Sequence, residues 1–206
     1  LCEERDEPLC GEKRPYFHSP YHFTLGANLA MGLKTPGVIN LFKSGIKEQG
    51  GFRFGLERLM KHHGMANGLF SADEHLNGAN PSQGTSLQTV VEMMNTLETL
   101  IGIGDFGAEP FDLLEKLAYN ALPAAFTPDM KRYQRVQQAN QIKISKDKRK
   151  WYSADDAANL FIPAQADLDC ASCHQAWPKF TASLWYATAD GGLSAASYAP
   201  CTVRCT

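Results

Sequence analysis

The sequence has little excess of charge of either sign, because 20 Lys and Arg residues stand against 22 Asp and Glu residues and leave a formal net charge of −2. A near-neutral chain lacks the positive charge that neutralises phosphates, so nucleic acid is not an expected partner. The chain has no run of about 18 apolar residues, which predicts no membrane span. Its 17 glycines and 11 prolines exclude collagen-like and low-complexity chains. We therefore expect an ordinary globular fold of one domain or slightly more.

The six cysteines fall into two terminal groups and one close internal pair: Cys2 and Cys10, Cys201 and Cys205, and Cys170 with Cys173. The four terminal cysteines lie in short, polar, turn-rich segments with little apolar content. Such cysteines favour disulfides, and hence a secreted protein or another oxidising compartment, with free thiols as the alternative. Four cysteines can pair in three ways, and the sequence does not choose among them.

Helical periodicity dominates the first 125 residues. The clearest helix follows a cap at Thr85 or Ser86 and carries an apolar face that runs to Ile101. Pro110 suits the first turn of another helix, which continues to Leu122. Three earlier helices are predicted at 22–34, 38–48 and 52–62, the first of them ending at the Thr-Pro-Gly of 35–37. The segment 64–84 is predicted to be a long loop, and such loops are often functional.

The rest of the chain is less regular. Periodicity is lost over 128–165, apart from a short helix predicted at 154–160, and a basic cluster in this region is interpreted as a solvated surface: Lys143, Lys146, Lys148, Arg149 and Lys150. A β-hairpin is predicted after residue 181, with its turn at 190–192. The sequence thus divides into an irregular arm at 1–20, a helical domain at 21–180, and strands with a cysteine-containing tail at 181–206.

Few charged residues stand out as candidates for chemistry. Glu74, inside the long loop, would suit a general acid if partly buried, although a solvent-facing loop carboxylate is the simpler interpretation. His62 and His63 would complement a helix end as readily as they would bind a metal. His18 and His22 have a spacing found in metal sites, but no third ligand lies near them in the sequence.

The sharpest local pattern is Cys170-Ala171-Ser172-Cys173-His174. The spacing C-x-x-C-H is that of c-type haem attachment, with His174 as the axial ligand. Met65, Met93, Met94 or another histidine would then supply the sixth ligand. The same thiols would equally suit a zinc site, a disulfide or a nucleophilic thiolate.

Longer segments resemble glycoside hydrolase family 127, the β-L-arabinofuranosidase-like proteins. The resemblance extends from about residue 16 to residue 200 and is carried by these segments: NLAMGLKTPGV (28–38), HHGMANGLFSADEHLNGANPSQGT (62–85), VVEMMNTLETL (90–100), LAYNALPAAFTPDM (117–130), QQANQ (137–141), HQAWPKF (174–180) and LWYATADGGLSAASYAP (184–200).

The resemblance implies a fold and a chemistry. The fold is mainly α, part of an (α/α)6 helical barrel followed by a short C-terminal β-hairpin that begins a β-module. A complete barrel of twelve helices exceeds this length, so we expect another protein chain or an oligomer to cover the exposed helix faces. The family's enzymes retain configuration and use a zinc-bound cysteine thiolate as nucleophile and a glutamate as acid/base, which departs from the usual two-carboxylate scheme.

Residue by residue, the match to the family is incomplete. Its acid/base glutamate falls on Glu74, but its zinc-binding Glu-x-Cys falls on Ser86 and Gln88, which are poor zinc ligands. A family histidine falls on Leu25. A family tyrosine falls near Arg135, or on Tyr133 if a gap is allowed. The family's Cys-Cys pair falls on Asp169-Cys170, with Cys173 as an extra thiol.

These losses predict a glycosidase-like scaffold that is catalytically degenerate and acts as a structural or carbohydrate-binding subunit. Two alternatives stay open. One is an active retaining glycosidase with Glu74 as acid/base and Asp169 or Cys170 as nucleophile. The other is a c-type haem subunit that uses Cys170, Cys173 and His174.

Overall fold

The computed structural model describes residues 22–42, 49–104, 106–139, 141–151, 159, 161–163 and 176–204. Of these residues, 45% are helical and 16% lie in strands of small sheets. The prediction of a mainly α chain therefore holds only in part, because helices predominate but the fold is mixed.

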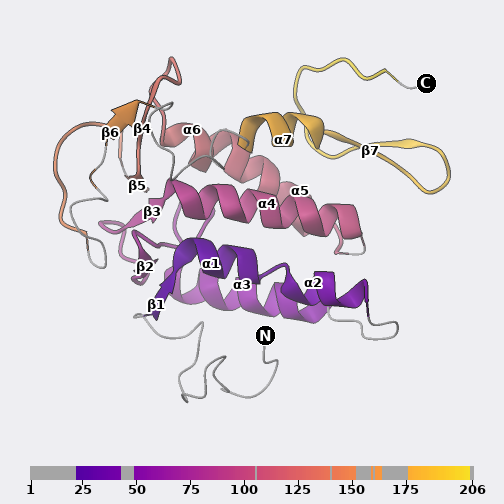
Figure 1. Ribbon diagram of the computed structural model, residues 1–206, viewed down its shortest axis with the longest axis horizontal. Coiled ribbons are helices and arrows are strands. Elements are labelled where there is room, and N and C mark those ends of the chain that lie inside the picture. Colours follow the sequence, from indigo (N-terminus) through magenta and orange to yellow (C-terminus); the bar gives the residue numbers. More distant parts are fainter. Residues whose placement is uncertain are drawn as a thin grey trace.

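The helices pack side by side around a long central helix, α4 (Figure 1). Their bounds are α1 (Gly26–Gly32), α2 (Thr35–Asn40), α3 (Gln49–His63), α4 (Leu87–Ile103), α5 (Glu109–Lys116), the π-helix η1 (Leu117–Ala121), α6 (Leu122–Ala124) and α7 (Ala176–Ala182). Helix α4 contacts α1 most extensively and also contacts α2, α5, η1, α6 and α7. None of the described helices combines the length and the apolar character that a membrane span requires.

Helix α4 confirms the strongest sequence prediction. The Ser86 hydroxyl accepts a hydrogen bond from the Thr89 N–H and caps the helix, and Gly104 ends it with φ of 83°. Side chains all around the helix are buried, including Val90, Leu97 and others of the predicted apolar face. A helix buried on most sides belongs at the centre of a core, which is where α4 lies.

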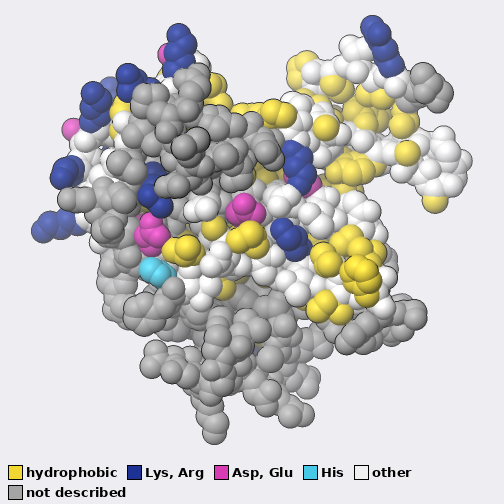
Figure 2. Space-filling view, viewed as in Figure 1, with side chains coloured by type: hydrophobic (Ala, Val, Ile, Leu, Met, Phe, Trp, Pro, Cys, Tyr) yellow, Lys and Arg dark blue, Asp and Glu magenta, His cyan; other side chains and the backbone are white. Residues whose placement is uncertain are grey.

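The strands form four antiparallel pairs. These are β1 (His22–Leu25) with β2 (His75–Leu76), β3 (Gly84–Ser86) with β5 (Val136–Gln138), β4 (Arg132–Gln134) with β6 (Phe161–Pro163), and β7 (Trp185–Ala187) with β8 (Leu193–Ala195). The β7–β8 hairpin confirms the predicted turn, at which Gly191 has φ of 82°. Figure 2 shows hydrophobic side chains gathered over this hairpin at the upper right, where Trp185, Leu193 and Tyr198 are exposed.

Several local predictions were wrong for identifiable reasons. The helix predicted from residue 22 begins as strand β1 and becomes helical only at Gly26. Pro36 does not end a helix but lies in the first turn of α2, where its missing N–H costs no hydrogen bond. By contrast, the helix predicted from Pro110 to Leu122 is present, as α5, η1 and α6 in succession. Its π-helical turn precedes Pro123, whose missing N–H cannot donate a hydrogen bond within a regular α-helix. The arm at 1–20 lies outside the described residues, as does the helix predicted at 154–160 apart from Asn159.

Region 128–165 was expected to be irregular, yet it supplies β4, β5 and β6. Each of these strands is three residues long and pairs with a distant segment. A segment this short carries too little periodicity to be recognised from the sequence.

A buried carboxylate joins α7 to α4. The side chain of Glu98 is 4% exposed, and its Oε2 lies 3.0 Å from the Lys179 Nζ. Burial raises the pKa of Glu98 above its ordinary value of 4.5, while the hydrogen bond and the charge of Lys179 oppose that shift to a smaller extent. The carboxyl group of Glu98 therefore binds its proton more tightly in the folded state than in the unfolded state.

We expect Glu98 to make the folded protein less stable as pH rises from 4.5 through the raised pKa of the folded state, because the folded state holds its proton longer. E98Q should remove this contribution, so the difference in unfolding free energy between the wild type and E98Q should change across that window. Urea denaturation at a series of pH values measures it. E92Q, on the same helix but half-buried, is the matched control. Parallel pH curves for the wild type and E98Q would contradict the assignment.

Candidate functional site

Glu74 is held by its backbone in the loop between α3 and α4. The Gly26 N–H at the start of α1 donates to the Glu74 carbonyl at 2.9 Å. The buried carboxylate of Asp73 accepts from the Glu74 N–H at 3.0 Å. With both backbone groups bonded, the position of the Glu74 backbone is set by the fold.

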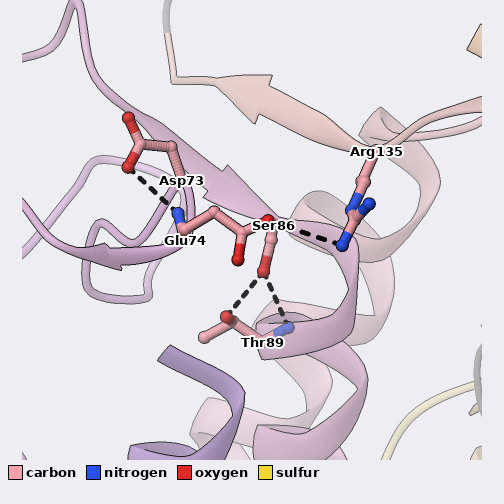
Figure 3. Close-up of polar contacts among 5 residues, drawn as sticks. All are labelled: Asp73, Glu74, Ser86, Thr89 and Arg135. Carbon is pink, nitrogen blue, oxygen red and sulfur yellow. Dashed lines mark hydrogen bonds and ion pairs between the residues drawn. The ribbon is translucent and has the colours of Figure 1, made fainter. Parts of the chain in front are cut away.

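Ser86 lies beside Glu74, at the junction of β3 and α4 (Figure 3). Its Oγ accepts from the Thr89 N–H at 3.2 Å and lies 2.7 Å from the Thr89 Oγ1. The Ser86 N–H donates to the Ala72 carbonyl at 2.8 Å. A serine cap of this kind contributes about 1 kcal/mol to helix stability, so Ser86 has a structural role that needs no metal.

Arg135 is the cation at this site. It lies between β4 and β5, and its carbonyl accepts from the Leu87 N–H at 2.8 Å, which joins it to the first residue of α4. Its Nη2 lies 3.4 Å from the Glu74 Oε1, and the two side chains are 30% and 24% exposed (Figure 3). A carboxylate and a guanidinium thus face each other at a partly open surface.

The structure brings together three positions that the family resemblance had singled out: Leu25, Glu74 and Ser86. Leu25 is paired with His75 across β1 and β2, next to Glu74. Of the two candidates for the family's tyrosine position, Arg135 reaches this site. Tyr133 instead lies in the core, with its ring 5.9 Å from that of Phe126.

The described residues do not fit the zinc site of the resembled family. The hydroxyl of Ser86 is already bonded to Thr89, and the side chain of Gln88 is exposed on α4. Neither is a usual zinc ligand. Within the described ranges, no three His, Cys, Asp or Glu residues cluster closely enough to hold a metal ion.

The other predicted site residues, Asp169, Cys170, Cys173 and His174, lie outside the described residues. The zinc, haem, disulfide and nucleophile interpretations of this segment therefore stay predictions. Two of the methionines considered as haem ligands, Met93 and Met94, are buried in the core cluster around α4.

The histidines also have structural surroundings. His63 is the last residue of α3 and is fully buried. Its Nδ1 accepts a hydrogen bond from the Gly78 N–H at 3.0 Å, and this bond connects the long loop to the helix. His62 lies beside it with ring centroids 6.4 Å apart. His18 is outside the described residues, as is the side chain of His22.

Among the described residues, Cys201 is an exposed free thiol. Its Sγ accepts from the Trp185 Nε1–H at 3.2 Å. The other terminal cysteines lie outside the described residues.

Sequence reasoning anticipated Ser86, as one of two candidates, as the cap of the helix that follows it. It did not anticipate the ion pair of Glu74 with Arg135. No local signal existed for that ion pair, since it depends on the pairing of β3 with β5. Comparison with protein-family models, with curated proteins and with solved structures gives no match to this chain.

Proposed function

We propose that the chain is a catalytically degenerate protein of the glycoside hydrolase 127 type that binds carbohydrate as a non-catalytic subunit. The observation that carries the proposal is the pairing of Glu74 with Arg135 beside the capped Ser86. The Glu74 carboxylate is engaged by the Arg135 guanidinium at 3.4 Å within the chain itself. Ser86, at the position of a zinc ligand, is used to cap α4.

The same geometry supports sugar binding. A carboxylate offers paired acceptors and a guanidinium offers a planar set of donors, a combination that suits neighbouring hydroxyl groups. The backbone of both residues is held by hydrogen bonds and the two side chains contact each other, so little order has to be gained on binding. L-Arabinofuranosides are the ligand class that the resemblance implies.

The proposal includes a partial (α/α)6 barrel that another protein chain or a further copy completes. The exposed apolar side chains of Leu41, Phe42 and the β7–β8 hairpin are consistent with such a covering partner. It also includes an oxidising compartment, which depends on the terminal cysteines other than Cys201. Intact mass under non-reducing conditions would test the disulfides.

The central test combines catalysis, metal content and binding. We expect no hydrolysis of a β-L-arabinofuranoside, less than stoichiometric zinc, and saturable binding of arabinofuranose oligosaccharides by calorimetry. E74Q and R135M should each weaken binding about tenfold, the effect of losing a charged hydrogen bond.

The control is R53M, which breaks the Arg53–Glu109 ion pair at 3.2 Å on another part of the surface. R53M should leave oligosaccharide binding unchanged. Stoichiometric zinc together with hydrolysis that E74Q abolishes would contradict the proposal and establish an active glycosidase. A red-brown preparation with a Soret band would establish the haem-binding alternative.

A further inference from the structure

An apolar groove of about 480 Å³ lies between α3 and α5. Leu56, Met60 and Leu113 provide its apolar lining. Its charged lining is mainly acidic and consists of Glu57, Glu109, Asp112 and, as the only cation of the lining, Lys116.

The charges of this groove are not balanced within the described part of the chain. Glu109 pairs with Arg53 at 3.2 Å, but neither Glu57 nor Asp112 has a hydrogen bond or ion pair with another described side chain. An occupant with an apolar side chain beside positive charge would bury the lining and neutralise these carboxylates.

The chain itself presents such a group on the loop that follows β5. Ile142 is 101% exposed, and it is followed directly by Lys143 and then by Lys146. Over 142–150 the sequence carries five Lys and Arg residues and one acidic residue, Asp147. Figure 2 shows Lys and Arg side chains along the left edge, the end of the molecule at which Figure 1 places β4, β5 and β6.

The tip of this loop is held by hydrogen bonds to the side chain of Gln134. The buried side chain of Gln134 accepts, through its Oε1, from the Gln141 Nε2–H at 2.8 Å and from the Ser145 N–H at 3.1 Å. The Gln141 side chain also donates to the Lys143 carbonyl at 2.7 Å. Ile142 and Lys143 therefore project from a closed turn, which lowers the entropy lost when they bind.

We propose that the 142–150 loop of one molecule docks in the α3–α5 groove of a second copy of this chain. Ile142 would contact the apolar lining, and Lys143 and Lys146 would face Glu57 and Asp112. Because the loop and the groove are different surfaces, the contact is head-to-tail, and an open assembly has one free loop and one free groove at its ends. This inference does not depend on the proposed carbohydrate binding.

Sedimentation velocity of the full chain tests the proposal. The wild type should associate in a concentration-dependent manner beyond the dimer, and added salt should weaken the association because the contact is partly electrostatic. I142D on the loop and E57K/D112K on the groove should each weaken association at least tenfold. Ile142, Glu57 and Asp112 are exposed, so both variants should keep the wild-type circular dichroism spectrum.

The decisive sample is an equimolar mixture of the two variants. The I142D molecule retains a working groove and the E57K/D112K molecule retains a working loop, so the mixture should form dimers and nothing larger. As a charge control, K131E/R132E should associate like the wild type, whereas K143E/K146E should not. A wild type that stays monomeric, variants that associate normally, or a mixture that stays monomeric would each overturn the proposal.

Discussion

Replacement of Gly26 by alanine is expected to lower the free energy of unfolding by about 3 kcal/mol, the upper end of the cost of overpacking. A Cβ at this position would lie 2.3 Å from the Ala72 Cβ and 2.7 Å from the Thr89 Oγ1. Ala72 cannot move away easily, because its N–H is bonded to Gly84 and its carbonyl to Ser86. Equilibrium urea denaturation measures the loss.

Gly32 provides the matched control at the other end of the same helix. Apart from its chain neighbours and the backbone of its own helix, no atom lies within 4 Å of the position of its added Cβ. G32A should therefore leave stability unchanged or raise it by up to about 1 kcal/mol, because alanine loses less backbone entropy than glycine in a helix. Equal losses for G26A and G32A would show that α1 is not packed against the long loop as described.

The success at α4 and the failure at β1 have the same physical origin. Helix α4 is 17 residues long, and its cap and its apolar residues repeat a local pattern many times. Strand β1 exists because His75 and Leu76 lie beside it, at least 50 residues away in the sequence. Its apolar residues also continue smoothly into those of α1, so the local pattern favoured a helix from residue 22.

The candidate site was predictable in its members but not in its interactions. The resemblance singled out Glu74 and Ser86 as neighbours of one site, and the structure places them together. The ion pair with Arg135 required the β3–β5 pairing, which brings Ser86 opposite Val136, the residue after Arg135. That pairing joins segments some 50 residues apart through three residues each, and no short-range pattern encodes it.

The variant S86E/Q88C is expected to bind zinc with a stoichiometry near one, in contrast to the wild type. The two substitutions restore the Glu-x-Cys of the resembled family at the start of α4. The resemblance implies that Cys170 supplies a further thiolate, and we expect the extra thiol of Cys173 to supply another. Four ligands of this kind are sufficient for a tetrahedral zinc site. The measurements are metal content after dialysis and the shift in melting temperature on addition of zinc, since a ligand at 1,000 times its Kd stabilises by about 4 kcal/mol.

The control S86E/Q88S loses the same serine cap, a cost of about 1 kcal/mol, but gains no thiol. Its zinc affinity should fall well below that of S86E/Q88C, because the hydroxyl is a poor zinc ligand beside a thiolate. Adding C170S to S86E/Q88C should likewise reduce zinc binding. If S86E/Q88C binds no more zinc than S86E/Q88S, then residues 86 and 88 do not face the cysteine pair. The position-by-position match to the family would then fail, and with it the interpretation of this site as a zinc centre that has been lost.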